Sequence, residues 1–189
     1  MRESDYPIHP LILNRWSPRA MSEEPLLESE LLPLFEAARW APSCYNEQPW
    51  RFIYAMRDTS AWSSLFELLV PFNQSWCKNA GALIVIASRT VSEKNGKPLS
   101  THSFDAGAAR ENFALEGAAR HLVVHGMQGF NYEKAQEVCE IDDNWVVEAM
   151  IAVGKLGNLS NLPKEVQEKE MQSNRKPLSE IIFDLHKKS

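Results

Sequence analysis

Two prolines, Pro42 and Pro49, bracket a short polar segment whose side chains are suited to binding. Between them lie the hydroxyl of Ser43 and the amides of Asn46 and Gln48. An amide both donates and accepts hydrogen bonds. Proline lacks an N–H and has a fixed φ, so these residues are expected to end a helix and then the loop. The segment is either a binding loop or a plain polar connection between a helix and a strand.

Basic residues gather at two places far apart in the sequence. Arg15 and Arg19 flank the hydroxyl of Ser17, and Arg175 is followed directly by Lys176. A planar guanidinium can hold a phosphate through two parallel charged hydrogen bonds. From the residues alone, the first place is better interpreted as a solvated turn and the second as a charged tail.

The longest helix is predicted over residues 103–124, because apolar side chains recur along it at helical spacing. Gly126 follows as the expected C-cap of that helix, and Gly129 lies in the turn beyond. Glycine permits backbone conformations and close approaches that other residues resist.

The first polar segment resembles the helix-end loop of the FMN-dependent nitroreductase family, whose pattern is roughly Ala-Pro-Ser-x-x-Asn-x-Gln-Pro-Trp-x-Phe. Eight positions match: Ala41, Pro42, Ser43, Asn46, Gln48, Pro49, Trp50 and Phe52. The family's opening pattern Arg-x-Ser-x-Arg is matched by Arg15, Ser17 and Arg19. Its second flavin loop, His-x-Met-x-Gly-Phe, is matched by His125, Met127, Gly129 and Phe130. Near the C-terminus Arg175 matches, whereas Ser173 replaces the usual lysine and Lys176 stands as its substitute.

The resemblance implies FMN contacts from all four segments. The implied cofactor-binding residues are Arg15, Trp16, Ser17, Arg19, Ser43, Asn46, Gln48, Gly126, Met127, Gln128, Gly129, Arg175 and Lys176. Arg15 and Arg175 are assigned to the flavin phosphate, and Arg19 to the N1 region of the ring. His125 is expected to pack beside the site rather than act as an acid or base.

The segments that position these residues indicate an α+β fold. The pattern of residues predicts helices at 9–14, 28–41, 60–70, 103–124 and 132–139, a short helix or loop at 71–77, and strands at 50–56, 82–87 and 145–154. The last two strands are expected to be central. The resemblance implies a mixed, mainly antiparallel sheet flanked by helices, one domain over residues 1–189, and an intertwined homodimer with FMN at the interface.

The composition suits one soluble cytoplasmic domain. The chain has 189 residues, 44% apolar, and a net charge of −5 with acids and bases interspersed. This balance disfavours nucleic acid or a membrane surface as the main partner. Cys44, Cys77 and Cys139 show no zinc or disulfide spacing, so reduced thiols are expected, with Cys44 as a small buried filler.

The resemblance implies an oxidoreductase in which NADH or NADPH reduces FMN at N5. Electrons then pass to a nitroaromatic, quinone or related acceptor in ping-pong order. No catalytic side chain and no metal are required, because the flavin carries the chemistry. Two alternatives stay open: a specialised relative such as a dehalogenase or flavin-fragmenting enzyme, and a non-catalytic FMN-binding dimer.

Overall fold

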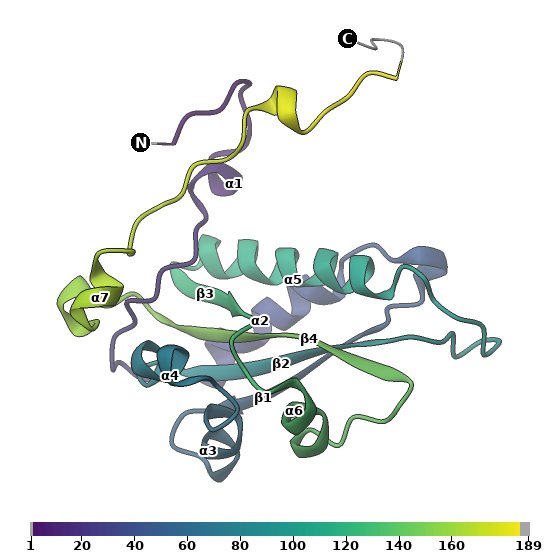
Figure 1. The fold of residues 1–189 in the computed structure, drawn as a ribbon, viewed down its shortest axis with the longest axis horizontal. Helices are drawn as coiled ribbons and strands as arrows, with labels where there is room; N and C mark the ends of the chain where they lie inside the picture. The colour runs from purple at the N-terminus through teal and green to yellow at the C-terminus, as the bar shows by residue number, and fades with distance from the viewer. Residues whose placement is uncertain (1, 186–189) are drawn as a thin grey trace.

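The computed structural model describes residues 2–185 and is built on one four-stranded sheet (Figure 1). The strands lie in the order β1 (Trp50–Met56), β2 (Ala82–Arg89), β4 (Trp145–Lys155) and β3 (Leu122–Met127). β2 and β4 are central, as predicted. The α+β class is confirmed, and every pairing within the described residues is antiparallel, where a mixed sheet was expected.

Helices cover both faces of the sheet, with α2 and α5 on one face and α3, α4 and α6 on the other (Figure 1). The helices of the described residues are α1 (Pro10–Asn14), α2 (Glu28–Arg39), α3 (Ser60–Phe66), α4 (Pro71–Cys77), α5 (His102–Ala119), α6 (Tyr132–Val138) and α7 (Lys164–Gln167). None of them is both long enough and apolar enough to cross a bilayer.

β2 is buried on both faces because its side chains alternate between two cores. Ile84 and Ile86 belong to the core beneath α2 and α5, which also contains the fully buried Phe113. Leu83 and Val85 belong to the core beneath α3, α4 and α6. Each large apolar side chain removed from water contributes about 1.5–3 kcal/mol, so the two cores hold the sheet between the helix layers.

The helix predicted over residues 103–124 is wrong at its C-terminal end. α5 stops at Ala119, the chain turns through His121 at a φ of 60°, and β3 begins at Leu122. β3 pairs with β4 along its whole length. Gly126 therefore lies inside a strand and is not a helix C-cap. Short apolar runs suit helix or strand alike, and the pairing with β4 decides the outcome.

The two ends of the described chain leave the sheet as arms that run side by side (Figure 1). We call residues 2–14 the N-terminal arm and residues 173–185 the C-terminal arm. Arg2 joins them, because its guanidinium donates to the carbonyl oxygen of Ser173 at 2.9 Å and of Arg15 at 2.7 Å. A groove of about 610 Å³ lies between the arms.

Large apolar side chains project from both arms. Those classed as exposed are Tyr6, Ile8, Ile12, Ile181, Ile182, Phe183 and Leu185. Large exposed apolar patches mark interaction surfaces more often than free solvent faces. The arms therefore have the chemical character of a contact surface.

Gly117 of α5 lies so close to β3 that no side chain fits there. A Cβ at this position would be 2.4 Å from Cγ2 of Val124. Gly117→Ala should therefore lower the free energy of unfolding by about 1–3 kcal/mol, measured by urea denaturation.

The matched control is Gly107→Ala in the same helix, where a Cβ would meet nothing within 4 Å. This change should raise stability by about 0.8–1 kcal/mol, because alanine is the better helix former. Similar effects of the two substitutions would contradict the close contact between α5 and β3.

Candidate functional site

Segment 15–19 runs across the open edge of β3, which is an outer strand of the sheet. The contact is made by Pro18, whose carbonyl oxygen accepts a hydrogen bond from Nδ1 of His125 at 3.0 Å. Trp16 and Ser17 are half-buried in the same segment. Two predicted flavin segments, residues 15–19 and residues 125–130, are therefore neighbours although they lie more than a hundred residues apart in the sequence.

Arginines from α5 and from segment 15–19 meet beside Gly126. The guanidinium of Arg110 packs directly on this glycine, since a Cβ there would lie 2.9 Å from its Nη2. Glu111 links the two arginines: its carboxylate is 2.9 Å from Nη1 of Arg110 and 3.1 Å from Nε of Arg15. Sequence reasoning did not single out Arg110, because nothing in α5 indicates that it faces β3.

Beyond β3 the backbone of Gln128 and Gly129 presents open donors. The carbonyl oxygen of Gly129 accepts from the amide of Asn73 and from the N–H of Val70, each at 3.0 Å. Within residues 2–185, no hydrogen bond occupies the N–H groups of Gln128 or Gly129. A Cβ on Gly129 would lie 2.6 Å from Nδ2 of Asn73, so glycine is required. The side chain of Met127 is buried in the core beneath α3, α4 and α6.

Three arginines gather where the arms meet the sheet. Burial lowers the pKa of Arg2, and the positive charges of Arg175 and Arg15 lower it further. A bound anion would relieve this repulsion, so the cluster suits a phosphate. Arg2 was missed because its place beside Arg15 comes from the tertiary fold. Lys176 is exposed, and its Nζ lies 3.9 Å from Oε2 of Glu180.

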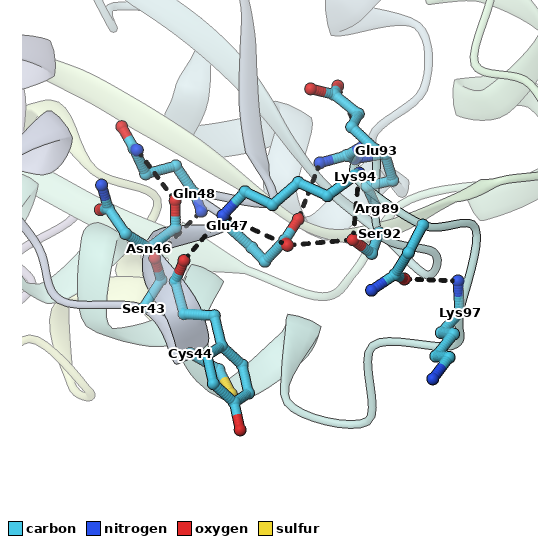
Figure 2. Close-up of polar contacts among 12 residues, drawn as sticks. Ser43, Cys44, Asn46, Glu47, Gln48, Arg89, Ser92, Glu93, Lys94 and Lys97 are labelled. Carbon is cyan, nitrogen blue, oxygen red and sulfur yellow. Dashed lines mark hydrogen bonds and ion pairs between the residues drawn. The ribbon is translucent and has the colours of Figure 1, made fainter.

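The loop between Pro42 and Pro49 has an unusual backbone. Tyr45, Asn46 and Gln48 have φ values of 49°, 55° and 48°. Such left-handed residues cost about 1–3 kcal/mol each and persist only where the surroundings enforce them. Ser43 accepts at Oγ from the N–H of Gln48 at 3.0 Å, and the Gln48 amide donates to the carbonyl oxygen of Asn46 at 3.1 Å (Figure 2).

Glu47 ties this loop to the end of β2 and the turn after it (Figure 2). Its carboxylate accepts from Oγ of Ser92 at 2.9 Å and lies 3.5 Å from Nζ of Lys94 and 3.7 Å from Nη2 of Arg89. Lys94 also donates to the carbonyl oxygen of Tyr45 at 2.9 Å. The side chains of Glu47 and Arg89 are both more than nine-tenths buried. This buried network enforces the strained loop, and sequence reasoning missed it.

The predicted site residues form two groups in one chain. Asp105, at the start of α5, accepts the N–H of Cys44 at 3.1 Å and so anchors the loop. Among residues 2–185, no hydrogen bond or ion pair joins residues 43–48 to segment 15–19, to residues 126–129 or to the C-terminal arm. Cys44 itself is exposed, so the expectation of a buried filler is wrong.

His125 is a packed neighbour of the site rather than a free acid or base. Its ring lies 4.6 Å from the ring of Trp76, and Arg19 is stacked over Trp76 with its guanidinium carbon 6.0 Å from the ring centre. Burial lowers the pKa of His125, and the charge of Arg19 acts in the same direction. Pro18 offers only an acceptor, so Nδ1 carries the proton in the neutral ring. No three His, Cys, Asp or Glu side chains of the described chain gather at a metal site.

Comparison with known proteins identifies the family. A protein-family model described as "Nitroreductase family" matches residues 12–67 and 55–155, which together span most of the chain. The chain belongs to the nitroreductase family. The predicted membership of this family is thereby confirmed.

Similar proteins agree with this membership. A solved structure described as an oxidoreductase containing FMN has a TM-score of 0.94 and 42% identity, covering 99% of this chain and 96% of its own. A Desulfovibrio desulfuricans protein solved in complex with FMN has a TM-score of 0.73 at 22% identity, covering 94% and 98%, and so shares the fold. An Archaeoglobus fulgidus protein named Putative NADH dehydrogenase/NAD(P)H nitroreductase is 29% identical over 150 residues, covering 76% of this chain and 82% of that protein.

The lowered pKa of His125 predicts a loss of stability in mild acid. The unfolded chain takes up a proton near the ordinary histidine pKa of about 6.5, before the folded protein does. This contribution to stability is therefore present above about pH 6.5 and is lost as the pH falls below it. Thermal melts of the wild type and of His125→Asn across this range should differ in slope, with the variant less sensitive.

Asparagine can still donate to the carbonyl oxygen of Pro18, so the contact with segment 15–19 is retained. His121→Asn is the control, because His121 is exposed. If His125→Asn kept the full pH sensitivity of the wild type, the buried histidine would not be its source.

Proposed function

We propose that this nitroreductase-family chain is an FMN-dependent oxidoreductase that uses NADH or NADPH. The observation that carries the proposal is the link between the arginine cluster and β3. Arg15 pairs with Glu111, Glu111 pairs with Arg110, and Arg110 packs on Gly126. A flavin mononucleotide has the matching parts, an anionic phosphate and a flat ring with polar edges.

The residues present fit this cofactor. Arg2, Arg15 and Arg175 supply the positive charge for one terminal phosphate. The N–H groups of Gln128 and Gly129 take part in no hydrogen bond within residues 2–185, so they are available to the polar edge of a flavin ring. Bound FMN would supply the redox chemistry, taking hydride from NADH or NADPH and passing electrons to an acceptor. The protein supplies binding, orientation and exclusion of water.

The polar loop contributes through a second copy of the chain. In the part of the chain that the structure describes, no hydrogen bond or ion pair joins Ser43, Asn46 or Gln48 to the arginine cluster, and Glu47 holds their loop in place. We place them against the flavin of a partner in a homodimer. The apolar arms supply the surface that such a dimer would bury. FMN then lies at the interface, and each site uses residues from both copies.

The acceptor is proposed as a nitroaromatic, quinone or related molecule, reduced in ping-pong order. Several connections between successive elements are short, such as residues 67–70 between α3 and α4 and residues 128–131 between β3 and α6. They leave little room for the lid that a dehalogenase or flavin-fragmenting relative would add over the flavin. A non-catalytic FMN-binding dimer is the other alternative. A cytoplasmic location stays a prediction from the composition.

The purified protein should be yellow, release FMN and not FAD on denaturation, and oxidise NADH or NADPH when a quinone is added. Parallel lines in double-reciprocal plots would support the ping-pong order. A protein that takes up no FMN on reconstitution would overturn the proposal. If the protein bound FMN but did not oxidise NADH or NADPH, the alternative of a non-catalytic FMN-binding dimer would be supported instead.

Arg175→Ala should weaken FMN binding by about one to two orders of magnitude, because a charged hydrogen bond contributes about 1.5–3 kcal/mol. Flavin fluorescence titration measures the change. Arg120→Ala is the matched control, since Arg120 pairs with Glu116 at the C-terminal end of α5. If Arg175→Ala bound FMN with wild-type affinity, Arg175 would not be part of the phosphate site.

The dimer should depend on the C-terminal arm. Phe183→Asp places a charge on a side chain that is 85% exposed in the single chain. The variant should dissociate at micromolar concentration and lose flavin together with the dimer, measured by light scattering during size-exclusion chromatography. Ser179→Asp on the same arm is the control. A monomer that binds FMN and turns over would contradict the shared site.

A further inference from the structure

Glu170, which follows α7, reaches back to the segment that crosses the edge of β3. Its Oε1 accepts the N–H of Arg19 at 2.5 Å and the N–H of Ala20 at 2.9 Å. Its Oε2 lies 3.5 Å from Nη1 of Arg19. The side chain of Glu170 is only 4% exposed. One buried carboxylate thus holds both the backbone and the guanidinium of the same arginine.

A buried carboxylate is costly unless its charge is compensated. A neutral amide oxygen could accept the same two backbone N–H bonds, so the hydrogen bonds do not require a charge. What the charge adds is a negative potential beside Arg19. Within residues 2–185, Glu170 is the one carboxylate within ion-pair distance of Arg19.

The other neighbours of Arg19 carry no negative charge. Trp76 lies beneath the guanidinium, and His125 beyond it is neutral because burial lowers its pKa. Solvent screens the pair little, since a quarter of the Arg19 side chain and almost none of the Glu170 side chain is exposed. The net charge that Arg19 presents to its surroundings is therefore set by Glu170.

We propose that Glu170 is a positioning residue that fixes Arg19 and offsets its charge, and thereby sets the midpoint potential of the flavin. The inference rests on the proposed function together with the position that the family resemblance implies for Arg19, which is beside the N1 region of the ring. Reduced flavin holds negative charge there, so a free arginine favours the reduced form. Glu170 weakens that preference, which lowers the potential and makes the reduced enzyme a stronger donor.

The experiment is Glu170→Gln, which keeps an oxygen acceptor for the two backbone N–H groups and removes the charge. The variant should bind reduced FMN more tightly relative to oxidised FMN by about tenfold, which for a two-electron couple raises the midpoint potential by about 30 mV. Reduction in equilibrium with a reference dye measures it. If the substitution only removed the hydrogen bonds from Glu170 to Arg19 and Ala20, the binding of oxidised and of reduced FMN would weaken equally. The midpoint potential would then be unchanged.

Glu116→Gln is the matched control, because it removes a carboxylate that pairs with Arg120 at the C-terminal end of α5. Its potential should equal that of the wild type. If Glu170→Gln binds FMN with the wild-type potential, the inference is overturned. A wild type that binds no flavin instead overturns the proposed function.

If Glu170→Gln does not fold, Glu170→Asp replaces it. This variant keeps the charge but draws it back by one methylene from Arg19. In this variant the affinity for reduced FMN relative to oxidised FMN should rise by less than tenfold, so the midpoint potential should rise by less than it does in Glu170→Gln. The binding of oxidised FMN should also weaken. Wild-type potential together with wild-type affinity in Glu170→Asp would likewise overturn the inference.

Discussion

The pairing of β3 with β4 is the constraint on which the candidate site depends. It converts an apolar run at the end of α5 into the outer strand of the sheet. Among residues 2–185, no further strand pairs with the outer edge of β3, and the imidazole of His125 holds Pro18 of segment 15–19 beside this strand. The same pairing brings Gly126 under the guanidinium of Arg110 and leaves the backbone after Met127 free to present its N–H groups.

Charge is the second organising feature of this edge. Arg2, Arg15 and Arg175 come from both arms and from the segment between α1 and the sheet. Burial lowers the pKa of Arg2, and the charges of Arg175 and Arg15 lower it further, an effect that a bound anion would oppose. Glu111 offsets the charge of Arg15, and Glu170 offsets the charge of the neighbouring Arg19. An arginine-rich site with compensating carboxylates at its margin concentrates the positive potential in one place, which is the condition for selecting a phosphate.

The polar loop shows how a strained backbone is maintained. Three left-handed residues would relax in an isolated peptide, so the conformation needs support from outside the loop. Glu47 provides it through a buried pair with Arg89 and bonds to the turn after β2. A buried ion pair adds little net stability compared with an apolar one, but it specifies one arrangement. Here the arrangement is the one that leaves the side chain of Asn46 exposed for contact with another molecule.

The sequence by itself determined the family, the central strands and the chemical character of the loop. These follow from local patterns: the eight matched positions from Ala41 to Phe52, and the apolar runs at 82–87 and 145–154. The tertiary structure alone decided that residues 122–127 form a strand, that Arg2 joins Arg15, and that Glu47 and Glu170 are buried partners of arginines. Each of these depends on a contact between residues far apart in the chain. A short apolar run or a single glutamate carries no local signal of its distant partner, because pairing, burial and charge compensation arise only when the sheet is assembled.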